Sequence, residues 1–96
     1  MAQIWTHGVW TVKQGHEEEF IAKWRELVPL GESLGAAPPT LLRDRQRPNV
    51  FRSFSPWADI DAIEAFRAEL RPRLGGMENV LEELEMFTLD EAYPGG

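Results

Sequence analysis

Residues 3–13 show a strict alternation of side chains that predicts a β-strand with two different faces. One face would carry Ile4, Thr6, Gly8, Trp10 and Val12, and the other would carry Trp5, His7, Val9 and Thr11. Alternation with a period of two, rich in β-branched and aromatic residues, is typical of a strand. Because both faces hold large apolar side chains, neither can simply point into water.

Two later segments have the spacing of amphipathic helices. The first follows Gly15 and opens with three glutamates, which suit the positive end of a helix dipole. We expect Pro29 and Gly31 to close it. In the second, Asp59 or Asp61 would be the N-cap, and Pro72 should kink or end the helix. The apolar stripes are Phe20, Ile21, Trp24, Leu27 and Val28 in the first helix, and Ile63, Phe66, Leu70 and Leu74 in the second.

Three further strands complete the predicted fold: Leu41 to Arg45, Val50 to Ser55 and Leu84 to Leu89. The first two would form a hairpin, because Gln46-Arg47-Pro48-Asn49 has turn chemistry. The order is β-α-β-β-α-β, the ferredoxin-like α+β arrangement, in which two helices cover one face of a four-stranded antiparallel sheet.

The second face of this sheet would remain apolar. Trp5 and Val9 contribute to it from the first strand, and Phe87 and Leu89 from the last. A twofold homodimer that packs two such sheets together would bury this face without adding a residue. We therefore expect a homodimer.

Length and charge narrow the possible partners. Ninety-six residues predict a single domain over 1–96, and the net charge of −6, from 16 acidic and 10 basic residues, argues against a nucleic-acid partner. A basic cluster at Arg43, Arg45, Arg47 and Arg52 includes Asp44, which is typical of polar cover on a solvated hairpin. The absence of cysteine excludes disulfides and thiolate sites.

The chain shows no sign of membrane targeting. Its N-terminus lacks the basic flank and apolar run of a signal peptide, and no stretch approaches the roughly 18 apolar residues of a membrane span. We expect a cytoplasmic protein with no membrane partner.

Several segments carry a family resemblance: the strand end VKQG, the helix HEEEFIAKWRELV, the hairpin LLRDRQRPNVFRSF, the junction SPWADIDAIEAFRAEL and the strand ELEMFTLDEAY. These segments span nearly the whole chain, and in them the chain resembles the antibiotic-biosynthesis monooxygenase-like (ABM) family. The resemblance implies a dimeric α+β barrel. It leaves the reaction open, because the family includes cofactor-independent oxygenases, haem-degrading enzymes and members without known activity.

The haem-degrading branch fits this sequence poorly. The resemblance implies an Asn on the first strand, a Trp at the end of the third and an axial His on the second helix. Trp57 matches the Trp, but Gly8 stands at the Asn position and Arg67 at the His position. Arginine cannot replace a neutral imidazole as an iron ligand.

Any chemistry would then come from the substrate itself, with no cofactor and no metal. The only histidines, His7 and His16, have no second histidine at ligand spacing. As in the cofactor-independent members, a small, hydrophobic aromatic or polyketide-like substrate would lose a proton, and its carbanion would pass an electron to dioxygen. The candidate substrate-binding residues are Gly8, Trp10, Trp24 and Phe66, and the candidate catalytic residues are Arg67, Trp57 and His7.

Each candidate has a structural alternative. Arg67 would stabilise the developing oxyanion, or it would only pair with Glu64 or Glu69 at a helix surface. His7 has the pKa range of a general base, yet it shares a strand face with Trp5 and Val9 rather than with the pocket side. The three tryptophans and Phe66 would be pocket walls or ordinary core.

The predicted function is cofactor-independent oxygenation. The alternatives are a non-catalytic ligand-binding or stress-response dimer, an isomerase acting on a small lactone, and, disfavoured by the residues above, a haem-degrading enzyme.

Overall fold

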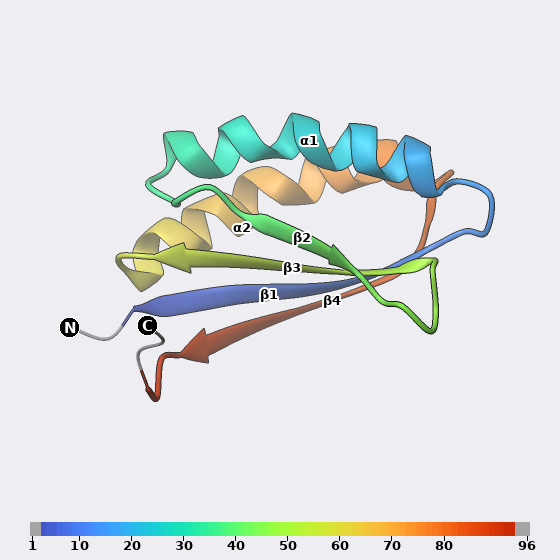
Figure 1. Ribbon diagram of the computed structural model, residues 1–96. Helices are drawn as coiled ribbons and strands as arrows, with labels where there is room; N and C mark the ends of the chain where they lie inside the picture. Colours follow the sequence, from blue (N-terminus) through green and yellow to red (C-terminus); the bar gives the residue numbers. More distant parts are fainter. Residues whose placement is uncertain (1–2, 94–96) are drawn as a thin grey trace.

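The computed structural model describes residues 3–93 and shows two layers, a sheet and a pair of helices (Figure 1). The elements in chain order are β1 (Ile4–Val12), α1 (Glu17–Ser33), β2 (Thr40–Arg43), β3 (Val50–Trp57), α2 (Ile60–Leu74), a short 3₁₀ turn (Gly75–Met77) and β4 (Leu81–Asp90). No helix within the described residues is long and apolar enough to cross a bilayer.

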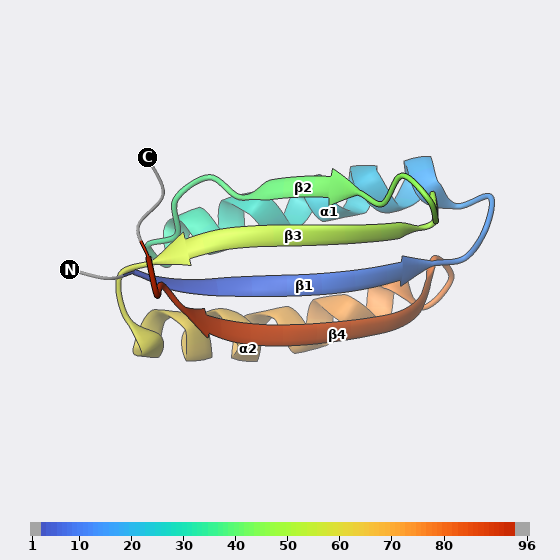
Figure 2. The ribbon, with the colours of Figure 1, turned by 60° about the horizontal axis from the view of Figure 1, so that its bottom comes forward.

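The strands form one antiparallel sheet in the order β2-β3-β1-β4, with both helices on the same face (Figure 2). This is the ferredoxin-like α+β fold, and the prediction of its element order and layers is confirmed. In the register, Thr6 lies opposite Ser55 of β3, and Gly8 lies between Ser53 of β3 and Met86 of β4.

The alternation along β1 divides its residues between the two faces as predicted. Thr6, Gly8, Trp10 and Val12 are buried beneath the helices, whereas the residues between them are only half-buried. The main core cluster lies toward one end of this layer and contains Trp10, Val12, Phe20, Phe51, Met77 and Val80. Aromatic side chains therefore make up half of that cluster, consistent with the high tryptophan and phenylalanine content.

Helix α1 is longer than its sequence pattern predicts. It continues through Pro29 and Gly31 to Ser33, so the expectation that these two residues close it was wrong. Pro29 is exposed near the last turns, where water can satisfy the backbone carbonyl that its missing N–H leaves free. The helix ends instead just before Gly35, whose φ of +101° suits glycine.

The backbone around Gly35 closes α1 with a Schellman motif. The Ala36 N–H donates to the Gly31 carbonyl at 3.0 Å, and the Gly35 N–H donates to the Glu32 carbonyl at 3.1 Å. Gly31 and Glu32 thereby belong to the final helical turn. From this turn both residues line a pocket between the sheet and the helices.

Helix α2 begins as predicted and also continues past a proline. The Asp59 carboxylate caps it by accepting a hydrogen bond of 2.8 Å from the Ala62 N–H. Pro72 lies within the last turn and does not end the helix, which runs to Leu74 and continues into the 3₁₀ turn. Since Pro72 is exposed, the backbone group that it leaves unpaired can be hydrated.

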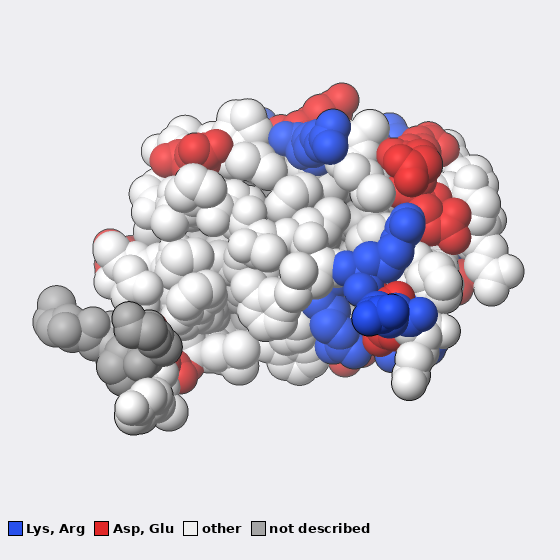
Figure 3. Space-filling model, viewed as in Figure 1, with Lys and Arg blue, Asp and Glu red and all other residues white. Residues whose placement is uncertain are grey.

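The β2–β3 loop starts earlier than predicted because Asp44 organises it. The Asp44 carboxylate accepts backbone hydrogen bonds from Gln46 at 2.8 Å and Arg47 at 3.0 Å, so β2 ends at Arg43. These two bonds lower the pKa of Asp44. Figure 3 shows basic side chains gathered at the end of the molecule that carries this loop, with acidic groups among them.

The second face of the sheet has no cover within the described chain. His7 lies at its centre, stacked on Phe54 with ring centroids 4.4 Å apart and near Phe87 at 5.7 Å. Phe87 and Leu89 remain 41% and 42% exposed. This face is therefore aromatic, apolar and open.

Candidate functional site

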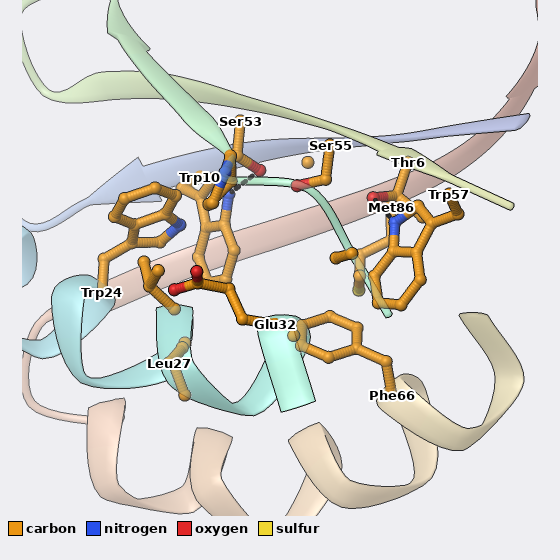
Figure 4. Close-up of a pocket in the computed structure, with 15 residues that line it drawn as sticks. Thr6, Trp10, Trp24, Leu27, Glu32, Ser53, Ser55, Trp57, Phe66 and Met86 are labelled. Atoms are coloured by element: carbon orange, nitrogen blue, oxygen red, sulfur yellow. Dashed lines mark hydrogen bonds between the residues drawn. The ribbon is translucent and has the colours of Figure 1, made fainter. Parts of the chain in front are cut away.

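A pocket lies between the sheet and the helices and opens to solvent, and its enclosed volume is about 50 Å³ (Figure 4). The sheet supplies its floor, three indoles and one phenyl ring supply its walls, and the end of α1 with the following loop closes one side. The floor consists of Thr6, Gly8, Ser53, Ser55 and Met86; the rings are Trp10, Trp24, Trp57 and Phe66; the remaining lining is Leu27, Val28, Gly31, Glu32, Ala36 and Pro39.

Two of the tryptophans are held in place by hydroxyl groups of the floor. The Trp10 Nε1–H donates to Ser53 Oγ at 2.9 Å, and the Trp57 Nε1–H donates to Thr6 Oγ1 at 2.9 Å. Both indoles are nearly inaccessible, with 3% and 2% of their surface exposed. They are core residues and pocket walls at once, because a buried indole needs a partner for its N–H and finds it on the pocket floor.

Gly8 creates the room that the Trp10 indole uses. A Cβ at this position would lie 2.7 Å from Trp10 Nε1 and 2.8 Å from Ser53 Oγ. The space beside this glycine is thus occupied by the hydrogen bond between Trp10 and Ser53. A side chain at position 8 would push these two groups apart.

Phe66 and Trp57 form the far wall of the pocket. Their ring centroids are 5.3 Å apart and tilted by 48°, a favourable arrangement for an aromatic pair. Phe66 comes from the apolar stripe of α2 and Trp57 from the last residue of β3. The pair therefore joins the sheet to the helix layer beside the cavity.

Among the described residues that line the pocket, Glu32 carries the only titratable side chain. The Schellman ending of α1 positions it at the mouth, where it is exposed to solvent. Figure 4 shows its side chain extending toward the side of the pocket where Trp10 and Trp24 lie. No lysine, arginine or histidine lines this pocket within residues 3–93, so its only formal charge is negative.

The structure places two of the predicted catalytic residues outside the pocket. Arg67 lies on α2 next to Phe66, but its Nη2 donates to Thr88 Oγ1 of β4 at 2.6 Å. Its Nε is buried and has no partner within the described chain. Arg67 would have to leave Thr88 to reach a ligand.

His7 lies on the opposite face of the sheet, and its role stays a prediction. Its Nδ1 is 3.2 Å from the Ser53 carbonyl oxygen. Because a carbonyl only accepts hydrogen bonds, Nδ1 must carry the proton of this contact. The remaining candidates, Gly8, Trp10, Trp24, Trp57 and Phe66, all line the pocket, and their roles likewise stay predictions.

Sequence reasoning missed the polar part of the site. Ser53 and Ser55 alternate on β3 with larger residues, and their period-two spacing was the only available signal. Glu32 was missed because the helix was expected to end before it. Within residues 3–93, no three His, Asp or Glu side chains are grouped so that they could hold a metal ion.

The fold and the cavity define a ferredoxin-like α+β protein with an aromatic pocket between its sheet and its helices. The family model for antibiotic biosynthesis monooxygenases matches residues 4–71, and the chain belongs to this family. The resemblance in the sequence is confirmed. No curated protein matches the chain significantly.

Solved structures share the whole fold. SnoaB from Streptomyces nogalater, a cofactor-independent oxygenase, is 22% identical with a TM-score of 0.76, covering 99% of this chain and 100% of that one. PA3566 from Pseudomonas aeruginosa is 23% identical with a TM-score of 0.80 and 97% coverage of both chains. SO0527 from Shewanella oneidensis is 20% identical with a TM-score of 0.78, covering 94% and 91%.

Proposed function

We propose that the protein is a cofactor-independent monooxygenase that oxidises a small, planar, electron-rich aromatic compound in the pocket between sheet and helices. One observation supports this most: the aromatic side chains Trp10, Trp24, Trp57 and Phe66 surround one apolar pocket, and such walls suit a flat aromatic ring. Membership of the monooxygenase family and a fold shared with SnoaB, a cofactor-independent oxygenase, point the same way.

The reaction would use the substrate as its own electron source. A ring CH₂ flanked by aromatic and carbonyl groups loses a proton, and the resulting carbanion gives one electron to dioxygen. The radical pair combines to a peroxide anion at that carbon, and this anion takes up the proton released in the first step to give a hydroperoxide. The O–O bond then breaks as the second C–H proton leaves, so that R₂CH₂ and O₂ yield R₂C=O and H₂O. Apolar walls exclude water and prevent premature quenching of the anion.

Oxygen consumption tests this proposal directly. Purified protein with a chelator is supplied with anthrones and hydroquinones, and oxygen uptake is followed with an electrode. We expect uptake above the buffer rate for at least one compound, with ketone or quinone formed in equal amount to the oxygen consumed. The variant Phe66→Ala should lose most of this rate, whereas Tyr93→Ala, remote from the pocket, should retain it. Uptake no faster than in buffer across the panel would refute the proposal.

A non-catalytic ligand-binding protein is the second candidate, favoured by the positions of His7 and Arg67 outside the pocket lining. It predicts that the same aromatic compounds bind without oxygen consumption. Calorimetry on the compounds used for oxygen uptake separates the two functions.

We further propose that the protein acts as a homodimer through the open face of the sheet. Trp5, His7, Phe54, Phe87 and Leu89 form an apolar surface there that the described chain leaves uncovered. A second copy presents the same surface and buries both at once. Sedimentation at micromolar concentration should give twice the monomer mass of 11.0 kDa, and stable 11 kDa particles would contradict the dimer.

A further inference from the structure

We infer that Ser53, Ser55 and Glu32 determine which ligand the pocket accepts: a neutral, planar aromatic ketone whose carbonyl oxygen faces the two serines and whose acidic hydrogen faces Glu32. This inference rests on the proposed function, since it concerns the same pocket. It assigns specificity to three residues that the proposed function does not use.

The hydroxyl groups of the floor are available as donors. An indole N–H can only donate, so Ser53 and Thr6 act as acceptors toward Trp10 and Trp57. Each hydroxyl therefore keeps its own hydrogen for another partner, and neither hydroxyl donates to another side chain in the described part of the protein. Ser55 has no side-chain hydrogen bond there either. The indoles thus orient the floor so that it presents O–H donors to a ligand.

The spacing of these donors suits one flat ligand. Ser53 and Ser55 lie two residues apart on the same face of β3, which separates them by about 7 Å along the strand. Thr6 is the cross-strand neighbour of Ser55. Gly8, opposite Ser53, adds no side chain that would rise between ligand and floor. The donors therefore form a short row beneath an apolar slot, as seen in Figure 4.

Glu32 supplies the complementary group at the mouth of the pocket. A carboxylate accepts hydrogen bonds and protons, and it repels a ligand that is already an anion. The lining within residues 3–93 contains no cation that would offset this repulsion. Glu32 also lies at the C-terminal end of α1, where the helix dipole adds further negative potential. A ligand with an acidic O–H or C–H is favoured, and a carboxylate is rejected.

Together these groups can accept the proton that the ligand releases and stabilise the anion that it leaves behind. The proton leaves the carbon or oxygen of the ligand for the Glu32 carboxylate. The electron pair that it leaves behind moves to the carbonyl oxygen, which becomes an enolate oxyanion. The hydroxyl of Ser53 or Ser55, whichever faces this oxygen, then donates to the oxyanion, and its hydrogen bond strengthens as the charge develops.

Binding calorimetry with three small probes tests the inference without requiring turnover. The probes are 5-hydroxy-1-tetralone, which has the ketone and the phenol; 5,6,7,8-tetrahydro-1-naphthol, which lacks the ketone; and 1-naphthoate, an anion of similar size. We expect the wild-type protein to bind the ketone about tenfold more tightly than either other probe, as expected for one or two hydrogen bonds or one unfavourable charge.

Variants assign this selectivity to residues. The Ser53→Ala, Ser55→Ala double variant should lose the preference for the ketone over the naphthol and keep its affinity for the naphthol. Glu32→Gln should gain about tenfold in affinity for 1-naphthoate. Glu26→Gln on the same helix and Ser33→Ala, both outside the pocket lining, should match the wild type.

The outcomes distinguish this inference from the proposed function. Selective binding without oxygen uptake upholds the inference and refutes the oxygenase. Equal binding of ketone and naphthol, an unchanged response of Glu32→Gln to naphthoate, or no binding of any probe at millimolar concentration overturns the inference, even if oxygen is consumed with other substrates.

Discussion

Strand β1 contributes to both faces of the sheet, and its residues have different surroundings on each. On the helix side, even-numbered residues of β1 build a closed layer in which the Trp10 indole is satisfied by Ser53 and a cavity remains. On the other side, odd-numbered residues build an open aromatic surface around His7. The first face is covered by the helices of this chain, whereas the second is left uncovered by the described residues. The comparison teaches that similar hydrophobicity on two faces does not imply similar roles.

Removing the Trp57 side chain tests the closed face most severely. Trp57→Ala should lower the free energy of unfolding by about 3–5 kcal/mol, because it leaves a large void. Trp57→Phe keeps most of the ring and should cost about 1 kcal/mol, mainly for the lost bond to Thr6. Urea unfolding followed by circular dichroism measures both values. A cost below 1 kcal/mol for the alanine variant would show that Trp57 is not an anchor of this layer.

A charge on the open face should act on association instead of folding. Phe87→Glu is expected to raise the dimer dissociation constant at least tenfold, since it would bury a carboxylate in an apolar interface. Sedimentation equilibrium measures this constant. Ala68→Glu adds the same charge to an exposed position of α2 and should leave the constant unchanged. Equal behaviour of the two variants would mean that the open face is not the interface.

Adding a methyl group at Gly8 should crowd the closed face and lower the stability of the protein by an intermediate amount. Gly8→Ala would place a Cβ 2.7 Å from Trp10 Nε1, so we expect a loss of about 1–3 kcal/mol in stability. Gly76→Ala meets no atom within 4 Å and is the matched control. In a Ser53→Ala background the cost of Gly8→Ala should shrink, because one of the crowded atoms is gone. Chemical denaturation of the four variants checks this coupling.

The smallest effect is expected at the Asp44 loop, outside both faces. Because hydrogen bonds from the Arg47 and Gln46 N–H groups lower the pKa of Asp44 below its ordinary value of 3.8, its contribution to stability is fully present above that value. The contribution is lost as pH falls through the lower, folded-state pKa. Asp44→Asn should therefore flatten the dependence of stability on pH below about pH 4, measured by thermal melts. An unchanged slope would contradict this assignment.

The fold could be predicted because the spacing of apolar residues and the residues that begin or end helices are local features of the sequence. Alternation placed Thr6 and Trp10 on one face of β1 and His7 on the other. Of the two predicted N-caps of α2, Asp59 and Asp61, the structure shows Asp59. The end of α1 was misplaced because Pro29 and Gly31 were expected to close it, whereas Gly35 does. An exposed proline near the end of a helix costs little, whereas a glycine with positive φ ends it.

The polar half of the site depends on contacts between distant segments. Ser53 meets Trp10 only through the β1–β3 register, and Glu32 reaches the pocket only because α1 continues past Gly31. Arg67 follows Phe66 in the sequence, but its long side chain reaches β4 and donates to Thr88. Register, helix length and rotamer are settled by packing, which the sequence pattern does not show.

The distribution of the four indoles makes each face optically distinct. Trp10, Trp24 and Trp57 surround the pocket, whereas Trp5 lies on the open face with its Nε1–H donating to Glu91 at 3.2 Å. A Trp5→Phe protein would emit only from the neighbourhood of the cavity, and a protein retaining Trp5 alone would emit only from the opposite surface. The molecule thus contains two sets of fluorophores, so that the proposed ligand entry and the proposed subunit association can be followed by emission as separate events.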